Sequence, residues 1–133
     1  MSLLNVNLED RMQLKILPDN TEAKIRVVRA EIAQSKSDYN RFNLALVLEV
    51  PDDPMVDDIR VWLPIPTQDQ KEDDPKRYVK QVDRIREFCE AFTVSMPVEV
   101  ATLIGLEGWA ILREEVGLEG TMQNSVRRFL ARR

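Results

Sequence analysis

The sequence contains no histidine and only one cysteine, Cys89, in its 133 residues. Histidine is the commonest general base and a frequent metal ligand, so its absence argues against most acid–base and metal-dependent catalysis. A single cysteine can form neither an intramolecular disulfide nor a thiolate zinc site. The common glycine-rich phosphate loops and the nucleophile elbow are also missing. We therefore predict a protein that is not an enzyme and that uses no cofactor and no metal.

Long apolar runs are missing as well. No stretch approaches the roughly 18 apolar residues of a membrane helix, and the N-terminus lacks the basic and apolar regions of a signal peptide. Hydrophobic residues nevertheless make up 44% of the chain and charged residues 32%, which is typical of a globular protein. We expect no membrane association, and the lone cysteine favours the reducing environment of a cytoplasm.

The net charge of -4 hides an uneven distribution of charge. Residues 121–133 contain four arginines and no acid, whereas the acids gather in residues 52–58 and 69–74. Acidic clusters of this kind are usually solvated loops, although the first could in principle hold Mg²⁺ for a nuclease. We expect Asp52, Asp53, Asp57 and Asp58 to bind no metal.

Alternating apolar residues predict three strands in the first half of the chain. In the first, from Glu22, the alternation slips near Val27 and Val28, which indicates a β-bulge. In the second, the apolar positions run from Phe42 to Val50. The third, from Ile59, places its apolar residues on one face and Trp62 on the other.

The second half begins with helical spacing from Pro75 to Phe92, preceded by Asp74 as the N-cap. A shorter helix is expected between Ser95 and Gly105. Two further strands follow, one from Gly108 and one ending the chain. Five strands with a helix between the third and fourth match the order of an OB-fold. The predicted fold is mainly β, a five-stranded OB-type barrel, with an N-terminal arm (1–17) and one OB-fold domain (18–133).

Trp62 is the strongest candidate for a binding residue. A large apolar ring on a solvated strand face is unfavourable unless something covers it, and aromatic platforms beside positive charge bind single-stranded nucleic acid. Arg60 shares its face, and Arg41 and Asn43 would lie on the neighbouring strand. Coverage of Trp62 by the N-terminal arm or by a partner subunit stays open as the alternative.

Four further residues complete the predicted nucleic-acid site. Lys36 and Tyr39 lie in the loop between the first two strands, which borders the ligand groove in OB-folds, although an ordinary hairpin would explain them equally well. Arg26 faces outward on the first strand. Arg127 lies in the last strand, where Val126 and Arg128 are expected on one face and Arg127 and Phe129 on the other.

The order of several segments resembles that of small phage single-stranded DNA-binding proteins. The relevant segments are LPDNTEAKIRVVRAEIAQSKSDYNRFNLALVLEV, REFCEAF, LIGLEGWAIL and NSVRRFLARR, over about residues 17–131. The resemblance implies an OB-fold with a helical insertion and sequence-tolerant binding of single-stranded DNA in phage replication or recombination, in the host cytoplasm. It also places Lys36, Tyr39, Arg41, Arg60 and Trp62 in the groove.

Two features depart from that family's pattern. Asn20-Thr21-Glu22 replaces the glycine and the aromatic residue expected at the entry to the first strand, and the chain ends in Arg132-Arg133 instead of an acidic tail. A basic terminus could itself touch phosphate. A homo-oligomer and replication proteins of phage or host stay open as partners. The alternative function is an OB-type protein-interaction or assembly module in which Trp62 docks a protein and no nucleic acid binds.

Overall fold

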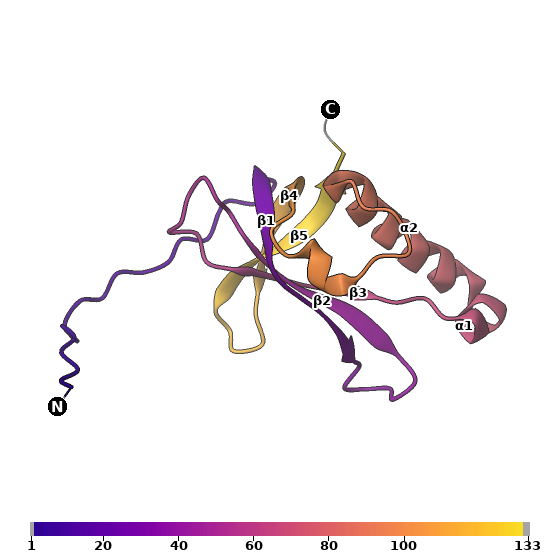
Figure 1. The fold of residues 1–133 in the computed structure, drawn as a ribbon, viewed down its shortest axis with the longest axis horizontal. Helices are drawn as coiled ribbons and strands as arrows, with labels where there is room; N and C mark the ends of the chain where they lie inside the picture. Colours follow the sequence, from indigo (N-terminus) through magenta and orange to yellow (C-terminus); the bar gives the residue numbers. More distant parts are fainter. Residues whose placement is uncertain (1, 132–133) are drawn as a thin grey trace.

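The structure is a computed structural model that describes residues 2–131, and it consists of one sheet with helices packed at its side (Figure 1). The strands are β1 (Glu22–Gln34), β2 (Phe42–Glu49), β3 (Ile59–Pro64), β4 (Glu107–Val116) and β5 (Met122–Leu130). The helices are α1 (Gln68–Asp73), α2 (Pro75–Phe92) and the 3₁₀ helix η1 (Val100–Leu103).

The five strands form one antiparallel sheet in the order β3-β2-β1-β4-β5. The predicted mainly β fold, with five strands and a helix between the third and the fourth, is confirmed. The predicted closure into a barrel is not. β3 and β5 approach each other, but within residues 2–131 no strand ladder joins them, so both stay edge strands.

Two bulges bend the sheet. The predicted bulge in β1 is confirmed, because the pairing with β2 shifts between Val27 and Arg29. A second irregularity, in the β4–β5 ladder, was not expected: Ile111 pairs with Arg128 but Leu112 pairs with Val126, so Arg127 has no partner in the register. The extra residue changes the alternation of β5.

The consequence of this second bulge is a correction to the predicted faces of β5. Val126 and Phe129 are both buried, and Arg127 and Arg128 between them are both exposed. Strict alternation had placed Arg127 and Phe129 on one face. The bulge lets two apolar side chains that are three residues apart reach the same core.

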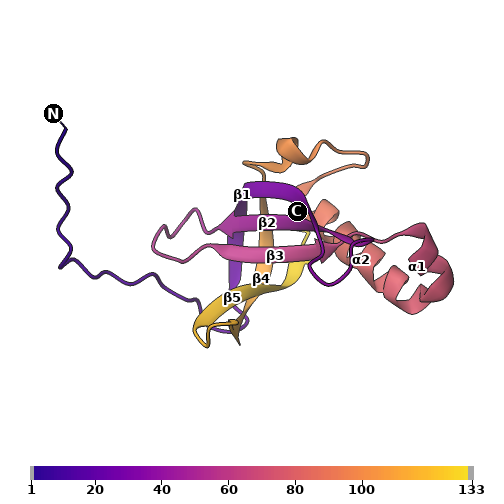
Figure 2. The same cartoon turned by 90° about the horizontal axis from the view of Figure 1, so that it is seen from below.

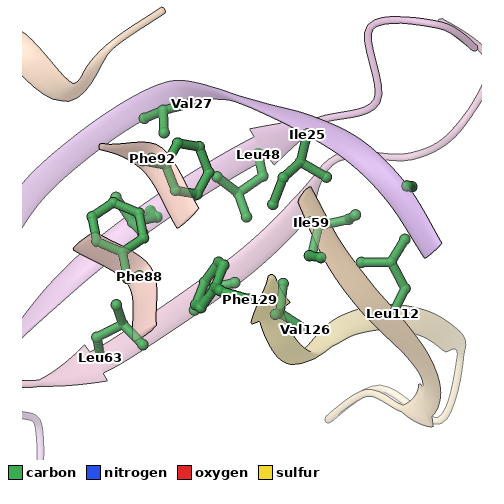
Figure 3. Close-up of a cluster of buried hydrophobic side chains, with 14 of the residues drawn as sticks. Ile25, Val27, Leu48, Ile59, Leu63, Phe88, Phe92, Leu112, Val126 and Phe129 are labelled. Atoms are coloured by element: carbon green, nitrogen blue, oxygen red, sulfur yellow. The ribbon is translucent and has the colours of Figure 1, made fainter. Parts of the chain in front are cut away.

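Three phenylalanines tie α2 to the sheet (Figure 3). Phe88 and Phe92 come from α2 and Phe129 from β5, and each is at most 3% exposed. The ring centroids of Phe88 and Phe129 lie 5.4 Å apart in an edge-to-face arrangement, a geometry that aromatic quadrupoles favour. The core therefore lies between α2 and one face of the sheet.

The helical segments agree with the sequence in part. α2 has the predicted bounds, with Pro75 at its first turn and the Asp74 side chain accepting from the backbone N–H of Arg77. α1 lies in a stretch read as an acidic loop, and the helix expected from Ser95 is only the single turn η1. Within residues 2–131, no helix combines the length and the apolar character needed to cross a membrane.

The segment that precedes β1 is hydrogen-bonded to the last strand, β5. The buried side chain of Asn124 accepts from the backbone N–H of Leu17 (2.8 Å) and donates to its carbonyl (2.9 Å). Asn20, which stands where the resemblance leads us to expect glycine, has a φ of 66°. Asparagine tolerates this left-handed conformation better than most residues, so the turn into β1 forms without glycine.

Candidate nucleic-acid interface

The face of β1, β2 and β3 that points away from the core is here called the outer face. Strand pairing aligns its side chains in rows: Arg29 with Val47 and Arg60, Glu31 with Ala45 and Trp62, and Ala33 with Asn43 and Pro64. In each row, neighbouring strands are about 4.8 Å apart. The rows place Trp62 in the middle of β3, between Arg60 and Pro64.

Trp62 is 59% exposed, although the residues before and after it are buried. The N-terminal arm does not cover it. Residues 2–14 run away from the sheet in both views (Figures 1 and 2). The arm is hydrogen-bonded to the rest of the described chain at its end, where the backbone of Lys15 pairs with Met55 and Asp57 and the backbone of Leu17 with Asn124. The outer face therefore presents an open indole.

Trp62 lines a groove between β3 and the hairpin that joins β4 to β5, here called the Trp62 groove. It has a volume of about 460 Å³. Its lining comes from two sides of the open seam of the sheet: Asp57, Asp58, Arg60 and Trp62 on one side, and Gly117, Leu118, Glu119, Thr121, Gln123 and Asn124 on the other. The groove is thus bordered by polar side chains around one aromatic ring.

The acids of residues 52–58 do not behave as one cluster. Asp53 forms an ion pair with Lys15 (2.9 Å), and the hydrogen bond from Lys15 lowers the pKa of the Asp53 carboxyl. Asp57 and Asp58 instead line the rim of the Trp62 groove. In the part of the chain that the structure describes, no three potential metal ligands come together.

Two arginines on the outer face have no carboxylate partner. Arg29 and Arg60 lie in the same row, two strand spacings or about 10 Å apart. Among residues 2–131, neither forms an ion pair. Arg60 was expected at the site, whereas Arg29 was missed, although the slipped alternation of the first strand already placed it on the polar side.

Arg41 and Asn43 line a second cleft, beyond Pro64, here called the Arg77 cleft. Its volume is about 390 Å³. It lies between the β1–β2 loop, the ends of β2 and β3, and the two helices, and is lined by Ser35, Ser37, Asp38, Arg41, Phe42, Asn43, Pro64, Ile65, Gln70, Arg77 and Gln81. The structure therefore separates Arg41 from Arg60 and Trp62, which sequence parity had grouped together.

The charge of Arg41 is largely compensated. Its guanidinium pairs with Asp38 (3.6 Å) and Asp69 (3.3 Å) and donates to the hydroxyl of Thr67. The pKa of Asp69 is lowered, first by the hydrogen bond from Thr67 and then by the charge of Arg41. Arg41 thus holds the loop against the start of α1.

The other predicted site residues are dispersed. Arg26 is paired with Glu49, with Nε 2.7 Å from the carboxylate, and Arg127 is paired with Asp19 at 3.3 Å. Lys36 and Tyr39 lie in the loop between β1 and β2, where Tyr39 is 84% exposed. Arg132 and Arg133 lie outside the described residues.

Sequence reasoning missed two further candidates. Leu118 stands fully exposed at the tip of the β4–β5 hairpin, beside the Trp62 groove. The sequence signal for Leu118 is a leucine in a turn between two glycines, where an apolar side chain is expected to be exposed. Arg77 lies on the exposed side of α2, and the apolar spacing of this helix predicts only the side that packs on the core.

Comparison with known proteins adds no relative: the chain matches no protein-family model and no curated protein.

Proposed function

We propose that this protein binds single-stranded DNA without strong sequence preference, by stacking bases on Trp62 and by contacting phosphates with the arginines of the outer face. The observation that carries the proposal is Trp62, a 59% exposed indole in a groove, next to the unpaired Arg60. Stacking on aromatic rings beside positive charge is how single strands are bound without reading their sequence.

The topology supports the same proposal. OB-folds bind oligonucleotides on the face of strands 2 and 3, between the loops that join strands 1 to 2 and 4 to 5. Here the Trp62 groove lies on β3 against the β4–β5 hairpin. We interpret the open sheet as an OB-type barrel whose seam between β3 and β5 is not hydrogen-bonded. A role in phage replication or recombination follows from the sequence resemblance and belongs to the proposal.

A second candidate function is favoured by the acids of the groove. Asp57, Asp58 and Glu119 line the groove together with Trp62, and the whole chain carries a net charge of -4. Such a rim repels phosphate and would suit a protein partner with basic residues around an apolar contact. In this alternative, Trp62 docks a protein and no nucleic acid binds.

A fluorescence titration separates the two functions. Trp109→Phe leaves Trp62 as the only indole, since the chain has two tryptophans. We expect oligo-dT to quench Trp62 and duplex DNA of equal length to have little effect. RNA of the same sequence tests the preference for the sugar.

Affinity for oligo-dT should also fall steeply with salt, because each phosphate contact releases counterions. Absence of binding at low salt would contradict the proposal and leave the protein-docking function.

A further inference from the structure

The Arg77 cleft lies on the path that a strand would follow beyond Trp62. On β3, Pro64 is two residues from Trp62 on the same face, a rise of about 7 Å, and Pro64 lines the cleft. Asn43 of the adjacent strand β2 pairs with Pro64 and also lines the cleft. The outer face thus leads from the Trp62 groove into the Arg77 cleft without crossing to another side of the sheet.

Arg77 supplies an uncompensated positive charge to this cleft. Arg41, the other guanidinium there, is paired with Asp38 and Asp69, whereas Arg77 forms no ion pair with any residue in the range 2–131. Its side chain is exposed, in the first turn of α2, where it is free to meet a phosphate.

Two glutamine amides give the cleft unused hydrogen-bonding capacity. Gln70 is 4% exposed and is the one buried residue of α1, an unusual choice for the anchor of a short helix. The side-chain oxygens of Gln70 and Gln81 are both buried, and neither has a hydrogen-bond partner among the described residues. A buried amide oxygen without a donor costs free energy. A ligand that offers hydrogen-bond donors would relieve it.

The geometry points to a nucleotide subsite in the Arg77 cleft. This subsite binds one nucleotide of the DNA strand, namely the neighbour of the nucleotide whose base stacks on Trp62. The phosphate binds Arg77, and the Watson–Crick edge of the base, which carries donors and acceptors, reaches the amides of Gln70 and Gln81. Because an amide can turn either end toward the base, the subsite accepts more than one base. This inference rests on the proposed binding of single-stranded DNA.

A length series tests the subsite on the full chain. We expect affinity to rise from the shortest oligo-dT that quenches Trp62 up to a longer one, within the range of about 4–16 nucleotides known for OB-folds. Arg77→Ala should reduce the gain from the added nucleotides, because only the base contact remains, and lower the salt slope by about 0.7 on the longer oligonucleotide only. The matched control is Arg86→Ala, on the same helix, whose arginine is already paired with Asp83 at 2.7 Å.

Abasic oligonucleotides test the contact with the base. Two versions of the longer oligonucleotide carry one abasic site each, at opposite ends. Only one of the two should bind more weakly than the intact oligonucleotide, because only one end reaches the cleft. In Gln81→Leu the difference between the two oligonucleotides should shrink, because only the Gln70 amide then remains to contact the base.

The outcomes separate the two proposals. Quenching of Trp62 with no length-dependent effect of Arg77→Ala overturns the subsite and leaves the proposed function standing. No quenching by any oligonucleotide overturns both.

Discussion

The two faces of β2 and β3 are built from alternate residues of the same strands, yet they have opposite properties. On the inner face, Leu46, Leu48 and Ile59 are at most 2% exposed. On the outer face, Trp62 is more than half exposed and stands beside the unpaired Arg60. Packing in the core explains the apolar residues of the inner face. It does not explain an apolar residue on the outer face. Trp62 therefore carries information about function, whereas the buried leucines report only on the fold.

The largest effect should follow from a change on the inner face. Phe129→Ala removes a ring that packs on Phe88 and lies beneath the guanidinium of Arg84. Truncation of a buried phenylalanine costs about 3–5 kcal/mol of unfolding free energy. Denaturant unfolding followed by circular dichroism measures it. A loss below about 1 kcal/mol would mean that the inner face is not the core.

The outer face should show the reverse behaviour. Trp62→Ala should weaken binding of oligo-dT by about 1–3 kcal/mol, which is roughly 5- to 150-fold. It should change the unfolding free energy by about 1 kcal/mol or less, as for other surface substitutions. Fluorescence anisotropy of labelled oligo-dT and denaturant unfolding give the two values. Intact affinity with a large loss of stability would make Trp62 a structural residue.

A smaller effect should separate unpaired from paired arginines. Arg29→Ala and Arg60→Ala should each lower the slope of log K against log salt by about 0.7, the value for one phosphate contact on a single strand. The control is the double variant Arg26→Ala/Glu49→Ala, which removes a paired arginine without changing net charge and should leave the slope unchanged. If the salt slope were the same for all three variants, Arg29 and Arg60 would not contact phosphate and the outer face would not bind DNA.

Neutralising the rim of the Trp62 groove should have a weak effect of opposite sign. Asp57→Asn/Asp58→Asn should tighten binding by about 1 kcal/mol or less at physiological salt, because screened surface charges interact weakly. The control Glu9→Gln/Asp10→Asn makes the same change of charge on the arm and should tighten binding less. Binding of a divalent ion by the native acids, seen by calorimetry, would instead revive a metal-dependent activity.

The smallest effect is expected for Arg127. Because Arg127 is paired with Asp19 at 3.3 Å, Arg127→Ala should leave the salt slope of DNA binding unchanged. A slope that falls by about 0.7 would place this arginine on the phosphates after all.

Much of the fold could be predicted because the inner face imposes a strict alternation. The three first strands, the bulge near Val27 and the bounds of α2 all follow from which residues must be buried. α1 could not be found in this way, since its one buried residue is the polar Gln70. The β5 bulge was missed because the buried residues of this strand include the polar Asn124 and Ser125, so apolar alternation does not mark its inner face.

The site was less predictable, because it depends on pairing between distant segments. Trp62 and Arg60 share one strand, so parity alone brought them together. Arg26 and Arg127 pair with carboxylates 23 or more positions away. Arg41 pairs with its near neighbour Asp38, but its second partner, Asp69, lies in a helix that was not expected. A sequence shows that a cation is present but not whether a carboxylate already neutralises it.

The hydrogen bonds between Leu17 and Asn124 join residues 107 positions apart. During synthesis, Leu17 therefore forms these two hydrogen bonds only after residue 124 has been made. The core likewise lacks the ring of Phe129 until β5 has been made. Contacts of such long sequence separation slow folding, so a nascent chain stopped before β5 exposes its apolar strand faces to chaperones and proteases.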